Sequence, residues 1–303
     1  MIDSIKIHFS TDNLLVLNIC LALIMFGIAL DMNVRDFKNL FQTPKPVIIG
    51  IIAQLIAAPL VTILLVYIFN PPPSVALGMV AISACPGGNN SNYSTHLAKG
   101  NTALAVTTTS LSVLACIFTL PLYIWLGGKI ISFGDRSGIA VSLGFTDMLK
   151  IVVTLILLPL AFGMYLGSIK NNRIEQLKKP FKIFSQVLFF SLIIAAIISN
   201  FQNIIQYVQH VFLIVLILNA AALATGYFFG KFNGLKEADC RALSFETGIH
   251  NVTLALIIIF NFFGGLGGMA LVAAWYGIWD LVTGFSLAMW WSRRENSLIK
   301  DKG

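Results

Sequence analysis

The sequence predicts an all-α integral membrane protein, and three observations support this prediction. Of its 303 residues, 57% are hydrophobic and only 11% are charged, against roughly 25% charged residues in a soluble domain. Apolar runs long enough to cross a bilayer follow one another along the chain. The basic residues gather in alternate loops between these runs. A soluble core of this size would need a charged outer shell, which the composition does not supply.

With about 20 apolar residues for each span, we expect nine transmembrane helices. Residues 1–12 lack the basic start and the small-residue cleavage site of a removable signal peptide, so we expect the first span to be retained. No soluble domain fits between the spans. They lie at about 13–31, 46–69, 75–98, 102–126, 146–168, 183–200, 209–230, 240–262 and 269–292.

The distribution of charge predicts the orientation of the chain. When the loops are placed on alternate sides, sixteen of the twenty basic residues fall on one side, and only Lys6, Lys129, Arg136 and Lys150 fall on the other. The richer side is cytoplasmic by the positive-inside rule, which puts the N-terminus outside and the C-terminus inside an inner (plasma) membrane. An odd number of spans agrees with this. The net charge of +7 is therefore a topology signal and not a nucleic-acid face.

Two of the spans are interrupted, near 86–92 and near 246–251. Pro86 removes a backbone donor, and Gly87 and Gly88 each weaken a helix by roughly 1 kcal/mol relative to alanine. Irregular backbone at membrane depth is tolerated only where protein or a water-filled cavity surrounds it. The interruptions lie five spans apart, so the two halves face opposite ways, with the first half one span short. This inverted-topology arrangement is typical of secondary transporters.

Two acidic side chains, Glu246 and Asp280, lie deep inside apolar spans, where a charge needs a partner. A bound cation would supply one, and oxygen ligands that suit hard cations occur in the neighbouring spans. The sequence therefore predicts Na⁺ or H⁺ coupling. Two alternatives are a protonated Glu246 bonded to another helix and threonines that only link helices. The candidate oxygen ligands are Gln54, Ser91, Asn92 and Thr107 to Thr109.

Other classes of function find less support. The cysteines show no metal-binding spacing and are expected to be packing residues. His96 and His250 lie beside neither a GxSxG nor an HExxH motif, so we expect no enzyme. A receptor or channel is a further alternative, which counterflow exchange would separate from a carrier.

Several of these motifs resemble the bile acid:sodium symporter family. The likeness runs from about residue 14 to residue 291, and the two interrupted spans are its most specific part. The motifs are Phe26-Gly27, Ile49-Gly50 with Ala53-Gln54, Cys85-Pro86-Gly87-Gly88, Ser91-Asn92, Leu97-Ala98-Lys99-Gly100-Asn101 and Glu246-x-Gly248 with Asn251.

The resemblance implies a fold and an activity. It implies two crossed, broken helices in a core domain (46–126 and 209–292), a panel domain (13–45 and 146–200), and loss of the first helix of a ten-helix fold. The expected activity is symport of an organic anion with Na⁺ by alternating access, in a protein that we expect to be a monomer. The anion would be a bile acid or a smaller carboxylate such as a keto or hydroxy acid.

The resemblance also implies ligands. The first sodium site would fall on Ser91, Asn92, Thr109 and Glu246, with Ala105 where the family has a further serine. The second site would use Gln54, the Glu246 carboxylate, the carbonyls of Thr247 and Ile249, and the side chain of His250, where the family usually has glutamine. Substrate contacts would fall on Asn89, Asn90, Asn251 and Asp280.

His250 and Asp280 depart from expectation. A neutral imidazole is a poor Na⁺ ligand and an imidazolium is a cation, so His250 is hypothesised to replace or tune one Na⁺, giving a lower stoichiometry or proton dependence. The alternative is a histidine satisfied by a helix carbonyl. Asp280 should repel a carboxylate substrate, and it either pairs with His250, binds a cation or lies away from the path.

Overall fold

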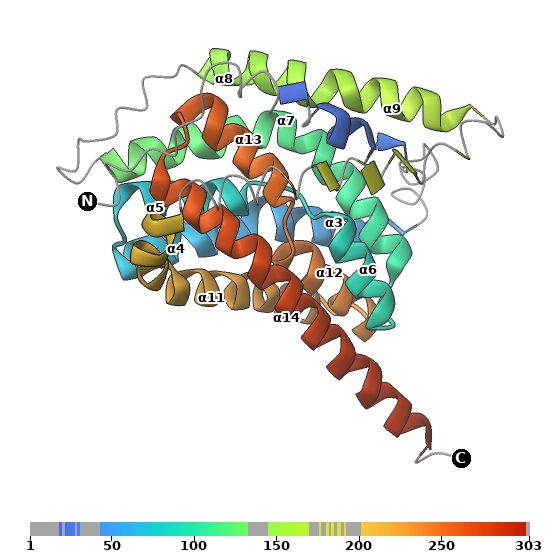
Figure 1. Cartoon of the computed structure of the whole chain (residues 1–303). Coiled ribbons are helices and arrows are strands. Elements are labelled where there is room, and N and C mark those ends of the chain that lie inside the picture. Colours follow the sequence, from blue (N-terminus) through green and yellow to red (C-terminus); the bar gives the residue numbers. More distant parts are fainter. Residues whose placement is uncertain are drawn as a thin grey trace.

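The fold is helical throughout the described part of the computed structural model (Figure 1), which confirms the predicted all-α class. That part comprises residues 43–132, 145–169 and 201–300, with 18–19, 22–27, 29–30 and a few residues between 176 and 191. The predicted spans 13–31 and 183–200 lie largely outside it. Within it, four helices are long and apolar enough to cross a membrane, namely Pro44–Phe69, Thr102–Ile130, Val211–Phe232 and Gly267–Arg294.

The first of these spans is divided by a π-helical turn. It consists of α3 (Pro44–Ile52), η2 (Ala53–Ala57) and α4 (Ala58–Phe69). Pro59 has no N–H to donate to Leu55 O four residues earlier, so an α-helix cannot continue there unchanged. The helix widens, and Ala58 N–H donates to Ala53 O instead. The hydroxyl of Tyr123 donates to Leu55 O.

The next span is broken, as predicted, but the break is displaced. Helix α5 (Pro73–Ser83) ends before Cys85, and α6 (Asn89–Leu97) already begins at residue 89. The prediction placed 86–92 in the break. The new helix starts earlier because Gly88 O accepts the backbone N–H groups of Ser91, at 3.0 Å, and of Asn92, at 3.5 Å. The helix α7 (Thr102–Ser132) follows without interruption.

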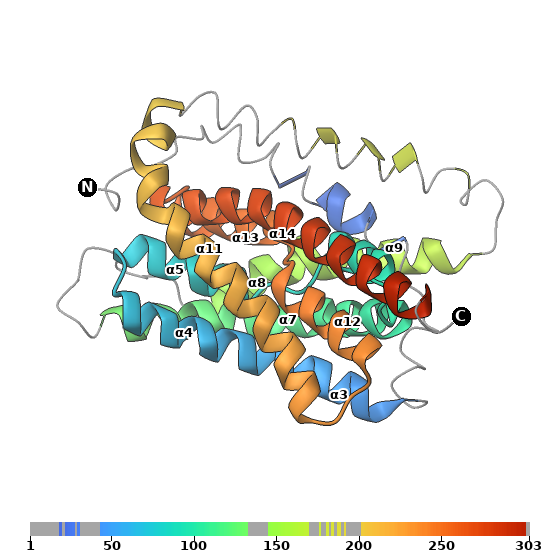
Figure 2. The ribbon, with the colours of Figure 1, turned by 90° about the horizontal axis from the view of Figure 1, so that it is seen from below.

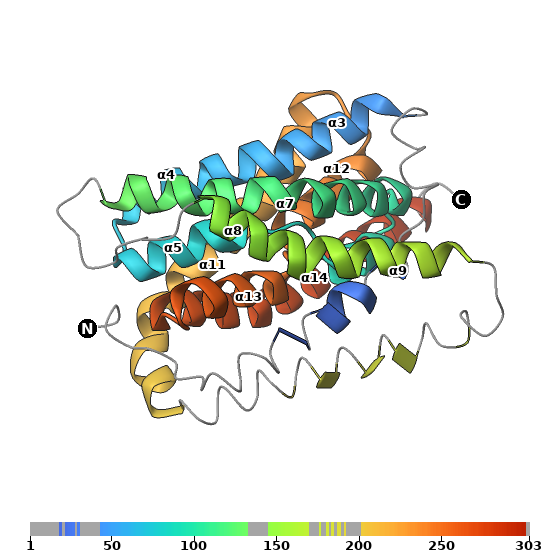
Figure 3. The ribbon, with the colours of Figure 1, turned by 90° about the horizontal axis from the view of Figure 1, so that it is seen from above.

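The middle of the chain forms the edge of the bundle. Helix α8 (Phe145–Val152), the π-helical turn η3 (Val153–Leu157) and α9 (Leu158–Ser168) lie along α7 (Figure 3), with α7 in contact with α8 and η3. Helix α11 (Phe201–Phe232) crosses the opposite face (Figure 2) and contacts α4, α12 and α14.

The last part of the chain contains the second break. Helix α12 (Glu237–Gly248) ends where Ile249 adopts an extended conformation (φ −112°, ψ 102°), and α13 (Val252–Phe263) begins at the N-cap Asn251. Glu246 therefore lies in the last turn of α12 and not in the break itself. Helix α14 (Gly267–Lys300) follows Gly264, whose φ of +56° suits glycine at a helix C-terminus.

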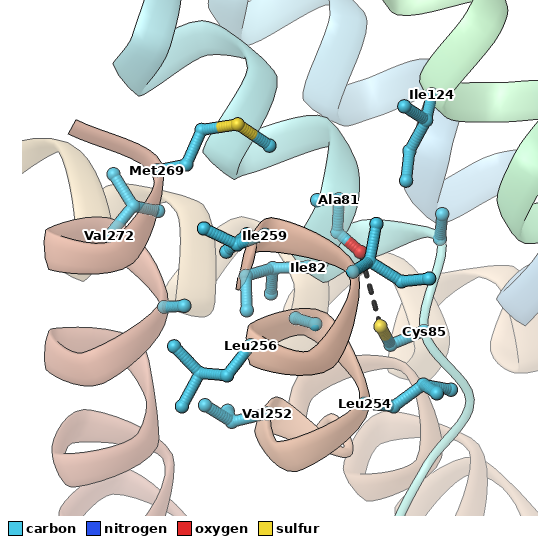
Figure 4. Packing of buried hydrophobic residues seen from close by; sticks show 14 of the residues in the cluster. Ala81, Ile82, Cys85, Ile124, Val252, Leu254, Leu256, Ile259, Met269 and Val272 are labelled. Atoms are coloured by element: carbon cyan, nitrogen blue, oxygen red, sulfur yellow. Dashed lines mark hydrogen bonds between the residues drawn. The ribbon is translucent and has the colours of Figure 1, made fainter. Parts of the chain in front are cut away.

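Apolar side chains enclose the first break. Residues from α5, α7, α13 and α14 pack around Cys85 (Figure 4), whose Sγ donates to Ala81 O at 3.2 Å. Cys85, Cys116 and Cys240 are all buried and free, as expected of packing residues. The break is thus surrounded by protein, which is the condition for irregular backbone at membrane depth.

Candidate functional site

The two breaks lie against each other as short antiparallel segments. Gly87 pairs with His250, and Asn251 N–H donates to Pro86 O at 2.9 Å. In a continuous helix, that N–H would donate to the carbonyl of Thr247. The Thr247 carbonyl therefore loses its helical donor at the place where the two breaks meet.

Glu246 is completely buried and receives hydrogen bonds from two other helices. Ser91 Oγ, on α6, donates to one carboxylate oxygen, and Thr109 Oγ1, on α7, lies 2.7 Å from the other. Asn92 Oδ1 lies 3.4 Å from the same threonine oxygen. The fold thus brings together Ser91, Asn92, Thr109 and Glu246, the four residues of the first predicted sodium site. Carboxylate and hydroxyl oxygens keep further lone pairs with which to bind a cation.

Gly87 allows this carboxylate to approach the broken backbone. A Cβ atom at Gly87 would lie 2.5 Å from Glu246 Oε2 and 3.2 Å from Ser91 Oγ. The sequence identified Gly87 only as a residue that weakens a helix. The structure adds that a side chain at this position would push the carboxylate away.

Gln54 reaches the first break from the π-helical turn η2. Its Nε2 donates to Cys85 O at 2.9 Å, and the side chain is fully buried. Its Oε1 has no hydrogen-bond partner in the part of the chain that the structure describes. A buried acceptor without a donor is costly unless something else binds it, and an amide oxygen is a ligand for hard cations.

His250 belongs to a polar network at the second break. Its Nδ1 lies 3.1 Å from Tyr276 OH, which lies 2.9 Å from Gly248 O. Asn219 Nδ2 also donates to Gly248 O at 2.9 Å, and Thr283 Oγ1 donates to Asn219 Oδ1 at 2.7 Å. Sequence reasoning missed Tyr276, Asn219 and Thr283. An amide in the middle of an apolar span was the one signal that could have pointed to Asn219.

The other predicted ligands are placed as follows. The Thr247 hydroxyl lies 2.9 Å from both Ala222 O and Leu243 O, so it is engaged by backbone carbonyls, and the group of Thr247 that faces the breaks is its own carbonyl. Ile249 is extended, which turns its peptide out of the helical direction. Thr107 Oγ1 donates to Ala103 O of its own helix at 2.8 Å.

The predicted substrate residues are more dispersed. Asn90 is exposed on the first turn of α6, and the Asn89 side chain lies outside the described residues. Asn251 is buried, and its Oδ1 caps α13 by accepting Leu254 N–H at 3.3 Å. Asp280 is buried on α14 and forms no ion pair with His250 among the described side chains, so that expected alternative is not observed.

The donor set favours a hard monovalent cation. Residues 43–132, 145–169 and 201–300 contain no group of three or more His, Cys, Asp or Glu side chains that could hold a metal ion. The converging atoms are instead hydroxyl, amide, carbonyl and carboxylate oxygens, with one imidazole. Such a set suits an alkali ion better than zinc or copper.

Comparison with known proteins gives the same picture. Residues 18–207 match a family model described as the Sodium Bile acid symporter family. The chain is 29% identical over 278 residues to the "Uncharacterized sodium-dependent transporter YocS" of Bacillus subtilis (strain 168), covering 92% of this chain and 83% of that protein. It is 28% identical over 272 residues to the "Probable sodium/metabolite cotransporter BASS3, chloroplastic" of Arabidopsis thaliana, covering 88% and 60% respectively.

A human relative named "P3 protein" is 28% identical over 257 residues, covering 83% of this chain and 52% of that protein. The chain therefore spans about half the length of this human relative and about 60% of the length of the plant relative. The match to the family model ends before the second break, so the similarity there depends on the whole-chain relatives.

Proposed function

Because this chain belongs to the sodium bile acid symporter family, we propose that it is a secondary transporter in which Na⁺ drives the uptake of a small organic anion. The family and the matched relatives are transporters and not enzymes. The names of these two relatives, "sodium-dependent transporter" and "sodium/metabolite cotransporter", support Na⁺ as the coupling ion and a small metabolite as the substrate.

The observation that carries the proposal is the environment of Glu246. The carboxylate is fully buried, it is bonded by hydroxyls from α6 and α7, and no described cationic side chain pairs with it. A charge in such a place is costly without a partner. A Na⁺ ion bound by Glu246, Ser91, Asn92 and Thr109 would supply the opposite charge between the two broken spans.

A second Na⁺ is proposed beside the first. Its ligands would be Gln54 Oε1, Glu246, the carbonyls of Thr247 and Ile249, and His250. The unpaired Gln54 oxygen and the lost helical donor of Thr247 support this assignment. The alternative is a carrier in which His250 replaces one ion and couples to fewer Na⁺ or to protons.

The substrate is proposed to bind at the N-termini of α6 and α13, which both begin at the breaks. The free N–H groups and positive dipole ends of these helices attract an anion. Asn89, Asn90 and Asn251 lie at these termini. Asp280 is buried on α14, and its carboxylate would repel a carboxylate substrate, so no direct contact with the carboxylate of the substrate is proposed for it. The word "metabolite" in the plant relative's name favours a keto or hydroxy acid over a bile acid.

We further propose that the site opens to each side in turn by movement of the core domain (46–126 and 209–292) against the panel domain (13–45 and 146–200). The first and fifth predicted spans pack closely, because a Cβ at Gly163 would lie 2.6 Å from Ala29 Cβ. This contact supports their assignment to one panel domain. Nine spans, an inner-membrane location and a monomeric state are part of the same proposal.

Removal of the Glu246 charge tests the function. In proteoliposomes we expect an inward Na⁺ gradient to drive uptake of labelled pyruvate or labelled taurocholate, with a Hill coefficient for Na⁺ near two. Glu246→Gln should abolish the Na⁺ dependence, because both proposed sites lose a negative charge and a ligand. Removal of such a buried charged group commonly weakens binding by about 100-fold or more. Initial uptake rates at varied Na⁺ measure both quantities.

The matched control is Glu237→Gln, which removes a carboxylate from the exposed start of the same helix. It should keep the Na⁺ dependence. A Hill coefficient near one would favour the carrier in which His250 replaces an ion. Uptake by Glu246→Gln that still follows the Na⁺ gradient would disprove the proposed site.

A further inference from the structure

One carbonyl oxygen with two donors determines the proton positions around the second break. Gly248 O accepts from Asn219 Nδ2 and from Tyr276 OH, each at 2.9 Å. Asn219 must present its NH₂ group there, since a carbonyl oxygen can only accept a hydrogen bond. A phenolic hydroxyl carries one hydrogen. Because Tyr276 directs that hydrogen to Gly248 O, it can meet His250 Nδ1 only as an acceptor.

The proton of His250 then lies on Nδ1, and Nε2 carries a lone pair. If Tyr276 donated to Nδ1 instead, Nε2 would bear a hydrogen. Nε2 is buried and has no partner among the described atoms, so this N–H would stay unpaired. A doubly protonated ring would have the same unpaired N–H, and no described carboxylate forms an ion pair with it.

A second open acceptor lies at the first break. Gln54 is bonded to Cys85 O, and His250 pairs with Gly87, two residues further on. Gln54 Oε1, like His250 Nε2, is buried without a donor. A buried lone pair at Nε2 that receives no donor can bind a cation, whereas an N–H at Nε2 would repel one.

We propose that Tyr276 is a positioning residue that holds His250 in its Nδ1–H tautomer, so that Nε2 can ligate a monovalent cation. The identity of that cation rests on the proposed function. Histidines that bind metals commonly donate their other N–H to a fixed acceptor, which sets both the tautomer and the ring orientation. Here Asn219 and Thr283 fix the Gly248 carbonyl, and this carbonyl fixes Tyr276.

The tautomer can be read directly by NMR of protein labelled with ¹⁵N-histidine. The chain has four histidines, and His250→Gln identifies the signals of His250. In Na⁺-free choline buffer we expect a protonated Nδ1 and an unprotonated Nε2, and added Na⁺ should shift the Nε2 signal. A protonated Nε2 in Na⁺-free protein overturns the inference. This measurement needs no transport, so it remains decisive even if Na⁺ coupling fails.

A variant tests whether Tyr276 acts through His250. Tyr276→Phe should raise the half-saturating Na⁺ concentration about tenfold or more, as loss of a group that orients a ligand does. Tyr165→Phe, at an exposed position on α9, is the control and should leave it unchanged. In a His250→Gln background, Tyr276→Phe should have little effect, because glutamine binds through an oxygen and has no tautomer. An equal loss in both backgrounds would show that Tyr276 only supports the Gly248 backbone, and would overturn the proposal.

Discussion

At the scale of single residues, the candidate site depends on a missing side chain as much as on those present. Gly87 lies within the first break, and its backbone approaches the Glu246 carboxylate closely enough that a Cβ would meet Oε2 at 2.5 Å. Its φ is not in the left-handed region. The reason for glycine here is therefore space and not backbone conformation.

Gly87→Ala should displace the Glu246 carboxylate and weaken Na⁺ binding. Overpacking of this kind costs roughly 1–3 kcal/mol. Because a shift of about 1 Å in a reacting or binding group can cost up to about 100-fold, we expect the half-saturating Na⁺ concentration to rise at least tenfold. Uptake at varied Na⁺ measures it, and Gly88→Ala is the control, since its Cβ would have no neighbour closer than 3.9 Å. Similar losses in both variants would contradict the explanation.

The sequence indicated the residues that gather around Glu246 but not the residues that support them. Glu246 stood out because a carboxylate is rare in an apolar span, and Ser91 and Asn92 followed the Pro-Gly-Gly motif. The contacts of Tyr276 with Gly248 and His250 join residues that are 28 and 26 positions apart. No local sequence pattern predicts these two contacts, because Tyr276 lies in an ordinary apolar helix.

At the scale of elements, helix interruptions position the candidate ligands. Pro86 and the glycines after it indicated that a break would occur, but not where the next helix would begin. That point depends on Gly88 O, which accepts the backbone N–H groups of Ser91 and Asn92. The π-helical turn η2 was not predicted. Pro59 was its visible cause, but the donor that satisfies Leu55 O comes from the distant α7.

Tyr123→Phe should disturb η2 and, through it, Gln54. Leu55 O would lose its hydroxyl donor at a cost of about 1–3 kcal/mol. We expect a lower apparent melting temperature in detergent and a several-fold weaker Na⁺ response, both measured by thermal shift with and without Na⁺. Tyr67→Phe, at an exposed position on α4, is the control.

The role of Pro59 gives this prediction a second test. Pro59→Ala restores the N–H that an α-helix would donate to Leu55 O. Tyr123→Phe should therefore cost less stability in that background than in the native protein. An undiminished loss would mean that the tyrosine stabilises the molecule by another route.

At the scale of the whole molecule, hydrogen bonds connect the loops at one end of the two broken spans. Asn101 N–H donates to Ala238 O at 2.9 Å, and Asn101 Nδ2 donates to Asp239 at 2.7 Å. Arg241 Nη1 donates to Ala98 O at 2.9 Å. The alternation of charge had assigned Lys99, Lys236 and Arg241 to one side of the membrane. The contacts agree with that grouping, although the motif at 97–101 gave no hint of the bonds.

The last prediction concerns which side of the membrane this end faces. Helix α7 starts at this end and runs for 31 residues, about 45 Å at 1.5 Å per residue, so Lys129 near its far end belongs to the opposite side. Lys129 and Lys236 are both exposed lysines, which makes Lys129→Cys and Lys236→Cys a matched pair. Because basic loops remain cytoplasmic, a membrane-impermeant maleimide added to intact cells should label Lys129→Cys and not Lys236→Cys.

Inverted vesicles should give the reverse pattern. The described native cysteines are buried and should contribute little background. Labelling of both positions from one side would contradict a bundle in which α7 crosses the membrane. Labelling of Lys236→Cys alone in intact cells would agree with the bundle but show the opposite orientation in the membrane. The charge bias would then not explain the orientation, and Na⁺ would reach Glu246 from the other face.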